Sequence, residues 1–168
     1  MGCDIHCFIE FNEYDEEDGK DGDWRPFGGE IHLGREYDVF GHIAGVRTSY
    51  VPVVPPRGFP SDAAYESVAA NTLNVVDSAE EAMDYGERCV LRENCEGWAP
   101  VGGDENKVWD PDNHTHTWLT LGEWVEALSR ERSHDYPLDP RYAAVTAAMT
   151  ALEMSDKIKT RIVIWFDN

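Results

Sequence analysis

The first residues of the chain alternate between apolar and mainly polar side chains, and this alternation constrains the fold more than any other feature of the sequence. In an extended chain one face would carry Cys3, Ile5, Cys7, Ile9 and Phe11, and the other Asp4, His6, Phe8 and Glu10. Because successive side chains of a strand point to opposite faces, the pattern predicts a β-strand with one apolar and one mixed face. A strand at a chain end frays unless it is paired. We therefore expect this strand to lie inside a sheet.

The other end of the chain also predicts a strand, because residues 161–166 are rich in β-branched and aromatic side chains. Between the two ends, apolar periodicity and capping residues predict helices over residues 35–47, 61–70, 78–88, from 121 to about Arg132, and from Pro140 onward. Thr120 and Glu123 form a capping box for the fourth helix, and Asp139 precedes the last one.

Together these elements predict an α+β fold. We expect a single domain over residues 1–168, in which a mixed or antiparallel sheet contains the N- and C-terminal strands as neighbours and helices pack on it. Residues 24–33 resemble a further strand, so the first 33 residues would form a long hairpin. Residues 89–112 are interrupted by Gly, Pro and Asp and are expected to be irregular.

The charge balance restricts the partners. The chain has 14 Lys and Arg against 33 Asp and Glu, a formal net charge of -19, which opposes binding to DNA or RNA backbones and to anionic membranes. No run approaches the roughly 20 apolar residues of a membrane-spanning helix, and the start lacks the basic and apolar regions of a secretory signal. We expect a cytoplasmic protein, and a reducing compartment favours free thiols for its four cysteines. The cysteine spacings do not match the knuckles of structural zinc sites.

Histidine and carboxylate side chains recur where they could share one site. Asp4 and His6 are two residues apart on the predicted first strand, and so are His114 and His116 if their segment is extended. Asp167 would join Asp4 and His6 if the terminal strands are neighbours. Histidine with carboxylate is a ligand set for zinc, manganese or iron. A metal ion in such a site, with one position open for water, can lower the pKa of that water to about 7.

This chemistry predicts a hydrolase. We expect His114, His116, Asp4 and Asp167 to hold a divalent metal, zinc or manganese, and His6, His116 and Asp4 to carry out the acid–base work. The sequence has no HExxH helix or other metal motif of fixed spacing. It also has no P-loop, GxGxxG or GxSxG, so nucleotide kinases, dinucleotide enzymes and α/β-hydrolases lose their usual support.

A structural role is the alternative for the same histidines. His6 would then be hydrogen-bonded beneath a loop, and His114 and His116 would be turn residues before the helix that begins near Thr120. A thiolate paired with His6 is disfavoured, because the neighbouring cysteines of the strand point to its opposite face.

Five segments of the chain stand out together: residues 1–6 (MGCDIH), 35–47, 56–60 (PRGFP), 114–120 (HTHTWLT) and the ending 164–168 (IWFDN). In this order they resemble a family of small uncharacterised proteins encoded mainly by bacteriophages and prophages. The resemblance spans nearly the whole chain. It implies an accessory protein that acts in the cytoplasm of the host bacterium. The positions it emphasises are Asp4, His6, Arg47, Arg57, His114, His116 and Asp167.

Three functions are hypotheses for such an accessory protein. A hydrolase of a nucleotide or another small phosphodiester, such as a host immune signal, would use the metal site, with Arg47 and Arg57 clamping the phosphate charge. A non-catalytic sponge would bind the nucleotide with the same arginines and Trp118, in a pocket at the subunit interface of a homo-oligomer. An acidic protein-binding module would use residues 13–23 to mimic nucleic-acid charge. We rank the hydrolase first because the polar cluster mixes histidine with carboxylate.

Overall fold

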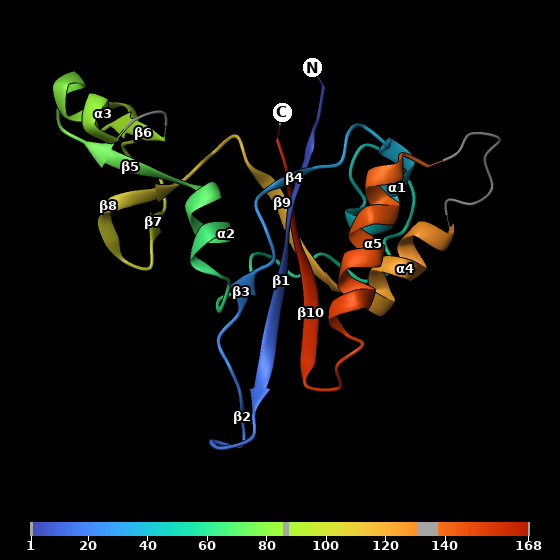
Figure 1. Ribbon diagram of the computed structural model, residues 1–168. Coiled ribbons are helices and arrows are strands. Elements are labelled where there is room, and N and C mark those ends of the chain that lie inside the picture. The colour runs from blue at the N-terminus through green and yellow to red at the C-terminus, as the bar shows by residue number, and fades with distance from the viewer. Residues whose placement is uncertain (1, 86–87, 131–137, 168) are drawn as a thin grey trace.

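The structure is a computed structural model that describes residues 2–85, 88–130 and 138–167. Its centre is the antiparallel pairing of two long strands, β1 (Ile5–Asp15) and β10 (Ile158–Phe166), in which Ile5 lies opposite Phe166. The two ends of the chain therefore lie side by side, as Figure 1 shows. The predicted α+β fold, with the terminal strands as neighbours in an antiparallel sheet, is confirmed.

Further strands extend this main sheet on both sides. β9 (His114–Thr120) pairs with the other edge of β10, and three short strands pair with β1, namely β2 (Lys20–Asp21), β3 (Arg25–Pro26) and β4 (Ile31–His32). The single strand expected over residues 24–33 is therefore replaced by the two-residue strands β3 and β4. Pro26 helps to interrupt it, because proline lacks the amide donor that a strand ladder needs.

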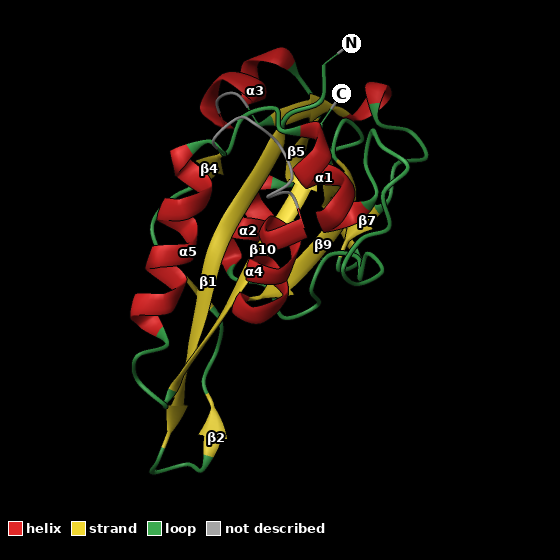
Figure 2. Ribbon diagram, turned by 90° about the vertical axis from the view of Figure 1, so that its right-hand side faces the viewer, coloured by secondary structure: helices red, strands yellow, loops and turns green. Residues whose placement is uncertain are grey.

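The apolar face of the main sheet packs against three helices, α1 (Tyr37–Ala44), α4 (Leu121–Arg130) and α5 (Pro140–Leu152) (Figure 2). Trp124 of α4 stacks on Tyr142 of α5, and both are 0% exposed. The strands contribute buried side chains that include Ile5, Cys7, Ile9, Ile162, Ile164 and Phe166. Each fully buried side chain of this size stabilises the fold by about 1.5–3 kcal/mol.

The helix starts follow the sequence signals. Thr120 Oγ1 accepts a hydrogen bond from the amide of Glu123 at 3.4 Å, and Glu123 Oε2 accepts one from the amide of Thr120 at 2.9 Å, which confirms the capping box. Asp139 Oδ1 accepts from the amide of Arg141 at 2.9 Å. The expected end of the fourth helix near Arg132 lies outside the described residues. Among the helices in the described ranges, none combines the length and the apolarity needed to cross a membrane.

A second, smaller sheet was not expected from the sequence. Its strand order is β6 (Cys89–Leu91), β5 (Thr72–Val76), β8 (Asp104–Trp109) and β7 (Pro100–Val101), and its connections include α3 (Ala79–Tyr85) and the short 3-10 helix η1 (Arg92–Asn94). The prediction that residues 89–112 are irregular is therefore wrong for much of that segment. The buried centre of this sheet consists of Val75, Cys95 and Val108, which is too small a set to produce a readable apolar period.

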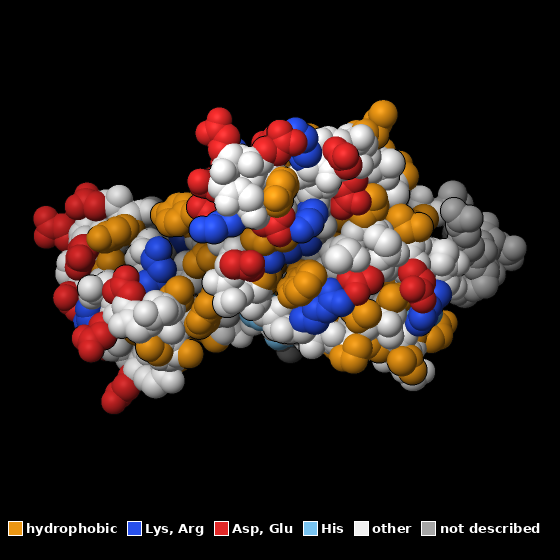
Figure 3. All heavy atoms as spheres, turned by 90° about the horizontal axis from the view of Figure 1, so that it is seen from below, with side chains coloured by type: hydrophobic (Ala, Val, Ile, Leu, Met, Phe, Trp, Pro, Cys, Tyr) orange, Lys and Arg blue, Asp and Glu red, His pale blue; other side chains and the backbone are white. Residues whose placement is uncertain are grey.

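The small sheet and its connections carry many of the acidic side chains. In Figure 3 acidic groups predominate at the left-hand end, which holds this part of the chain, whereas Lys and Arg lie among acidic groups near the middle. Exposed acids here include Glu80, Asp84, Glu93, Glu96 and Glu105. The small sheet thus carries part of the excess negative charge, and residues 13–23 carry another part.

The outer face of the main sheet, opposite the packed helices, contains a buried ion pair. Glu10 of β1 and Arg161 of β10 lie opposite each other and are 0% and 3% exposed. Arg161 Nε donates to Glu10 Oε2 at 2.7 Å, and Arg161 Nη1 donates to Asp62 Oδ1 at 2.7 Å. The guanidinium also lies 3.9 Å from the ring centroid of Trp24. The other partners of Glu10 are the amide of Ala64 and the hydroxyl of Ser67, at the start of α2 (Tyr65–Ala70).

We expect Glu10→Ala to lower the free energy of unfolding by about 3–5 kcal/mol, because it leaves the Arg161 charge buried without its main partner. The matched control is Glu126→Ala, which removes the exposed partner of Arg130 on α4 and should cost less than about 1 kcal/mol. Urea unfolding followed by circular dichroism measures both. Equal losses of unfolding free energy in the two variants would contradict the conclusion that the buried Glu10–Arg161 pair matters more to stability than an exposed ion pair.

Candidate functional site

The candidate site lies where the two ends of the chain meet. The amide of Asp4 donates to Asp167 Oδ1 at 2.9 Å, and the amide of Asp167 donates to the carbonyl of Asp4 at 3.2 Å. His6 Nε2 lies 3.1 Å from Asp167 Oδ2. The expectation that Asp4, His6 and Asp167 come together is therefore confirmed, and the antiparallel register of β1 and β10 is its cause.

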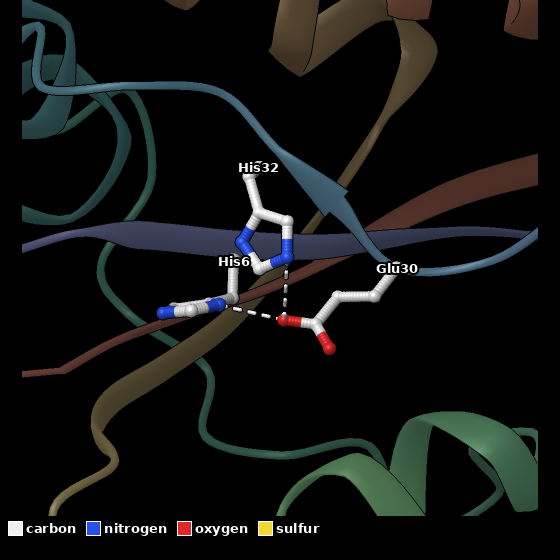
Figure 4. A group of neighbouring side chains, drawn as sticks. All are labelled: His6, Glu30 and His32. Carbon is white, nitrogen blue, oxygen red and sulfur yellow. Dashed lines mark hydrogen bonds and ion pairs between the residues drawn. The ribbon is translucent and has the colours of Figure 1, made fainter.

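Two residues that the sequence analysis missed complete the cluster. His6 lies directly opposite His32 in the pairing of β1 with β4, and their ring centroids are 5.0 Å apart. Glu30 Oε1 lies 2.6 Å from His6 Nδ1 and 3.9 Å from His32 Nε2 (Figure 4). One donor atom from each of the three side chains lies within 4.8 Å of the others. We call these three residues the His6 triad.

The signal for the missed residues was present in the sequence. Glu30 and His32 are two apart, as Asp4 and His6 are, so an extended segment places both on one side. The sequence does not show that β4 pairs with β1 at His6, because that pairing depends on a chain reversal over the intervening loop.

Electrostatics link the triad to Asp167. Burial lowers the pKa of His6, but its hydrogen bonds to Glu30 and Asp167 outweigh this and raise the pKa overall. The same hydrogen bond from His6 lowers the pKa of Glu30. The side chains of His6, Glu30 and His32 are 16%, 30% and 65% exposed, so the site opens to solvent on the His32 side.

The carboxylate of Asp4 is held by Arg35. Arg35 Nε lies 2.5 Å from Asp4 Oδ1, and Arg35 Nη2 lies 2.9 Å from Asp4 Oδ2. This two-pronged bond lowers the pKa of Asp4. The backbone amide of Asp4 takes part in the site because it donates to Asp167. The carboxylate of Asp4 holds the guanidinium of Arg35 beside it.

A bulge in β9 separates His114 from His116. The pairing with β10 shifts register between Ile164 and Phe166, and Thr115 has a φ of 49°, in the left-handed region. As a result the ring of His114 stacks on Phe166 of the helix-side core, with centroids 6.1 Å apart. The expectation that both histidines project from one face does not hold, because the strand is irregular between them.

Asn71 fixes the ring tautomer of His116. Asn71 is 0% exposed, and its Nδ2 donates to the carbonyl of Ser67 at 3.0 Å, so its Oδ1 is an acceptor. His116 Nε2 lies 2.9 Å from this oxygen and therefore carries a proton. Burial lowers the pKa of His116, and His114 adds to the effect. Burial thus favours the neutral form of His116, and the contact with Asn71 favours a proton on Nε2.

The two expected anion clamps have different surroundings. The guanidinium of Arg57 pairs with Glu123, lies 4.2 Å from the ring centroid of Trp118 and donates to the Trp118 carbonyl at 3.2 Å. Its charge is therefore balanced within the protein. Burial raises the pKa of the Cys3 thiol, and Arg47 opposes part of that shift. Arg47 thus lies beside the thiol of Cys3, which is buried on the helix side of the sheet.

Comparison with known proteins finds no relative. No family model, no curated protein and no solved structure matches the chain. The resemblance to phage-encoded proteins stays a prediction, and function must be argued from the site itself.

We expect NMR to find His116 as the Nε2-protonated neutral tautomer at pH 7.5, because the Asn71 oxygen can only accept a hydrogen bond and His116 Nε2 must therefore donate. Its ring should titrate below pH 6.5, since burial disfavours the charged form. Long-range nitrogen–proton correlation of ring-labelled protein measures both properties, with His116→Gln assigning the signal. An Nδ1-protonated ring would contradict the inferred orientation of Asn71.

Proposed function

We propose that the protein is a hydrolase that depends on a divalent metal, zinc or manganese, held by His6, Glu30 and His32. The observation that carries the proposal is the convergence of two imidazole nitrogens and one carboxylate oxygen within 4.8 Å. Two histidines and one glutamate form the ligand set of a known class of catalytic zinc sites, which keep a fourth position open. In this proposal His6, Glu30 and His32 take the place of the four predicted ligands, His114, His116, Asp4 and Asp167.

The spacing of the three donor atoms suits one ion. Neighbouring ligands of tetrahedral zinc lie roughly 3.3 Å apart, given bonds of about 2.0–2.2 Å. The two contacts of Glu30 Oε1, at 2.6 and 3.9 Å, lie on either side of that value. Small side-chain movements would therefore be enough to bind the ion.

Asp167 contacts the second ring nitrogen of His6, and this contact supports the proposal. A histidine that binds a metal usually gives its other ring N–H to a carboxylate, which fixes the ring and strengthens the ligand. His6 directs Nδ1 toward Glu30 and Nε2 toward Asp167 Oδ2. We therefore assign Asp167 as a positioning residue rather than a ligand.

A small phosphodiester is the proposed substrate. A bound divalent ion would supply a water with a pKa of about 7, as hydrolysis of such a bond needs. Arg35, whose side chain is 54% exposed beside Asp4, is the cation next to the triad that would meet a phosphate. Arg88 also acts on the pKa of Glu30 through its charge. These cations locally offset the net charge of -19.

We expect His32→Ala to weaken Zn²⁺ or Mn²⁺ binding on the order of 100-fold or more, because it removes a direct ligand. The loss of a residue that only supports a ligand typically costs about 10- to 100-fold. The 65% exposure of His32 makes a loss of folding by this variant unexpected. The matched control, His116→Ala, should keep wild-type affinity. Calorimetric titration and metal analysis of purified protein measure both, and metal loss in the control alone would contradict the ligand set.

The reaction itself is tested with cyclic dinucleotides and ADP-ribose derivatives. We expect hydrolysis products that disappear with EDTA and in His32→Ala. After incubation the protein is denatured by heat, and the released small molecules are analysed by mass spectrometry. A ligand released intact would replace hydrolysis by sequestration. Products that persist in EDTA and in His32→Ala would exclude the metal-dependent mechanism.

A further inference from the structure

A hollow of about 920 Å³ lies in the small-sheet lobe, the name we give to residues 72–110. Figure 1 shows the small sheet to one side of β1 and β10. The lining of the hollow is drawn from residues 75–108 and contains no member of the His6 triad. The hollow is therefore independent of the proposed metal site.

The topology of the small sheet explains where the hollow forms. β5 and β6 are parallel, and α3 lies between them in the chain. Residues that directly follow each of these strands line the hollow, Asp77 after β5 and Arg92 after β6. The antiparallel register that places Thr72 opposite Trp109 brings the start of β8, with Glu105, to the same edge. Crevices at the carboxyl ends of parallel strands are common binding sites in α/β proteins.

The floor of the hollow is apolar. Val75, Cys95 and Val108 form the buried centre of the sheet, and Leu91 and Trp98 are half-buried in the same lining. Within the described part of the chain, the indole N–H of Trp98 makes no hydrogen bond. A buried centre of three side chains is too small to cover these larger ones completely. The lobe therefore presents apolar surface, with one free donor on an aromatic ring, to a partner.

The cations of the small-sheet lobe already have partners. Arg92 Nε donates to Asp77 Oδ1 at 2.6 Å, and Arg88 Nη2 donates to Asp110 Oδ2 at 3.3 Å. Lys107 Nζ lies 5.7 Å from the centroid of an aromatic ring on α2. These three are the basic residues of the lobe, and its acidic residues far outnumber them. Most carboxylates of the lobe therefore cannot be neutralised from within it.

Three exposed carboxylates around the apolar floor have no cation. Glu93, Glu96 and Glu105 line the hollow, and their side chains make no hydrogen bond or ion pair with the residues that the structure describes. Among those residues the His6 triad is the group that brings three ligand atoms within 4.8 Å. The three carboxylates are thus spaced apart, which suits several cations along a chain better than one ion. Figure 3 shows acidic and hydrophobic side chains next to each other at this end of the molecule.

We propose that this hollow binds a basic peptide segment of another protein, in which one large apolar side chain is flanked by lysine or arginine. The apolar side chain packs against Trp98 and the floor, and the flanking cations pair with Glu93, Glu96 and Glu105. An aromatic anchor surrounded by complementary charge is a common arrangement in protein interfaces. A second copy of the chain is a poor occupant, because two molecules with a net charge of -19 repel each other.

The test measures binding of the full chain to labelled synthetic peptides by fluorescence anisotropy. The first panel carries one leucine, phenylalanine or tryptophan between lysines or arginines. Two matched panels replace the apolar residue by serine or the flanking cations by glutamate. We expect saturable binding of peptides from the first panel and no binding of the glutamate panel. The serine panel should bind about 10- to 100-fold more weakly, because burial of one apolar side chain has an effect of this size.

Two double variants compare the carboxylates of the hollow with others of the same lobe. Glu93→Gln with Glu96→Gln should weaken binding of the tightest peptide about fivefold, because each exposed ion pair contributes modestly. The matched control, Glu80→Gln with Asp84→Asn, removes two charges from exposed positions of α3 that do not line the hollow. Its affinity should stay within about twofold of the wild type. Thermal unfolding checks that both variants are folded.

NMR locates the bound peptide. Trp98 lines the hollow, whereas Trp124 is 0% exposed in the main core. We expect the indole N–H signal of Trp98, assigned with Trp98→Phe, to shift on saturation with the tightest peptide. The signal of Trp124 should stay in place.

Several outcomes would overturn the proposal. Absence of binding throughout the first panel, or an unmoved Trp98 signal, would remove the hollow as the docking site. Equal affinity of the serine panel, or equal weakening by the two double variants, would show a general attraction to the acidic chain. A dimer that shifts the Trp98 signal without peptide would assign the hollow to a second copy, and binding of a free aromatic amine as tight as that of the peptide would assign it to a small molecule. None of these results depends on metal binding or hydrolysis at the His6 triad.

Discussion

The pairing of β1 with β10 is the interaction on which the rest of the structure depends. It joins the first and last segments of the chain, so neither end is left to fray. Its register decides which side chains face the helices and which face outward, because a slip of one residue would exchange the two faces. With Ile5 opposite Phe166, the apolar side chains are buried under α1, α4 and α5.

The same register arranges the outer face as a row of polar chemistry along β1. His6, Glu10 and Asn12 all project from this face, with Phe8 between the first two. Glu10 and Arg161 are buried near the middle of the sheet and tie it to the segment that leads into α2. The His6 triad and Asn12 therefore lie on either side of a buried ion pair along β1.

The bulge in β9 shows how one residue changes the composition of a site. In a regular strand His114 and His116 would have shared the outer face with His6. The extra residue at Thr115 turns His114 toward Phe166, whereas His116 remains on the outer side and bonds to Asn71. Bulges re-aim side chains in this way. The histidine that approaches His6, His32, comes instead from the short strand β4.

The sequence by itself determined the terminal strands, the capped starts of α4 and α5, and the meeting of Asp4, His6 and Asp167. These features follow from local periods and from the rule that a terminal strand needs a neighbour. Only the tertiary structure decided that Glu30 and His32 join His6, that Arg57 is neutralised by Glu123, and that residues 89–112 contribute to a second sheet. The reason is that cross-strand neighbours depend on chain reversal, register and bulges, which place residues together through contacts distant in sequence, and no local period encodes those contacts.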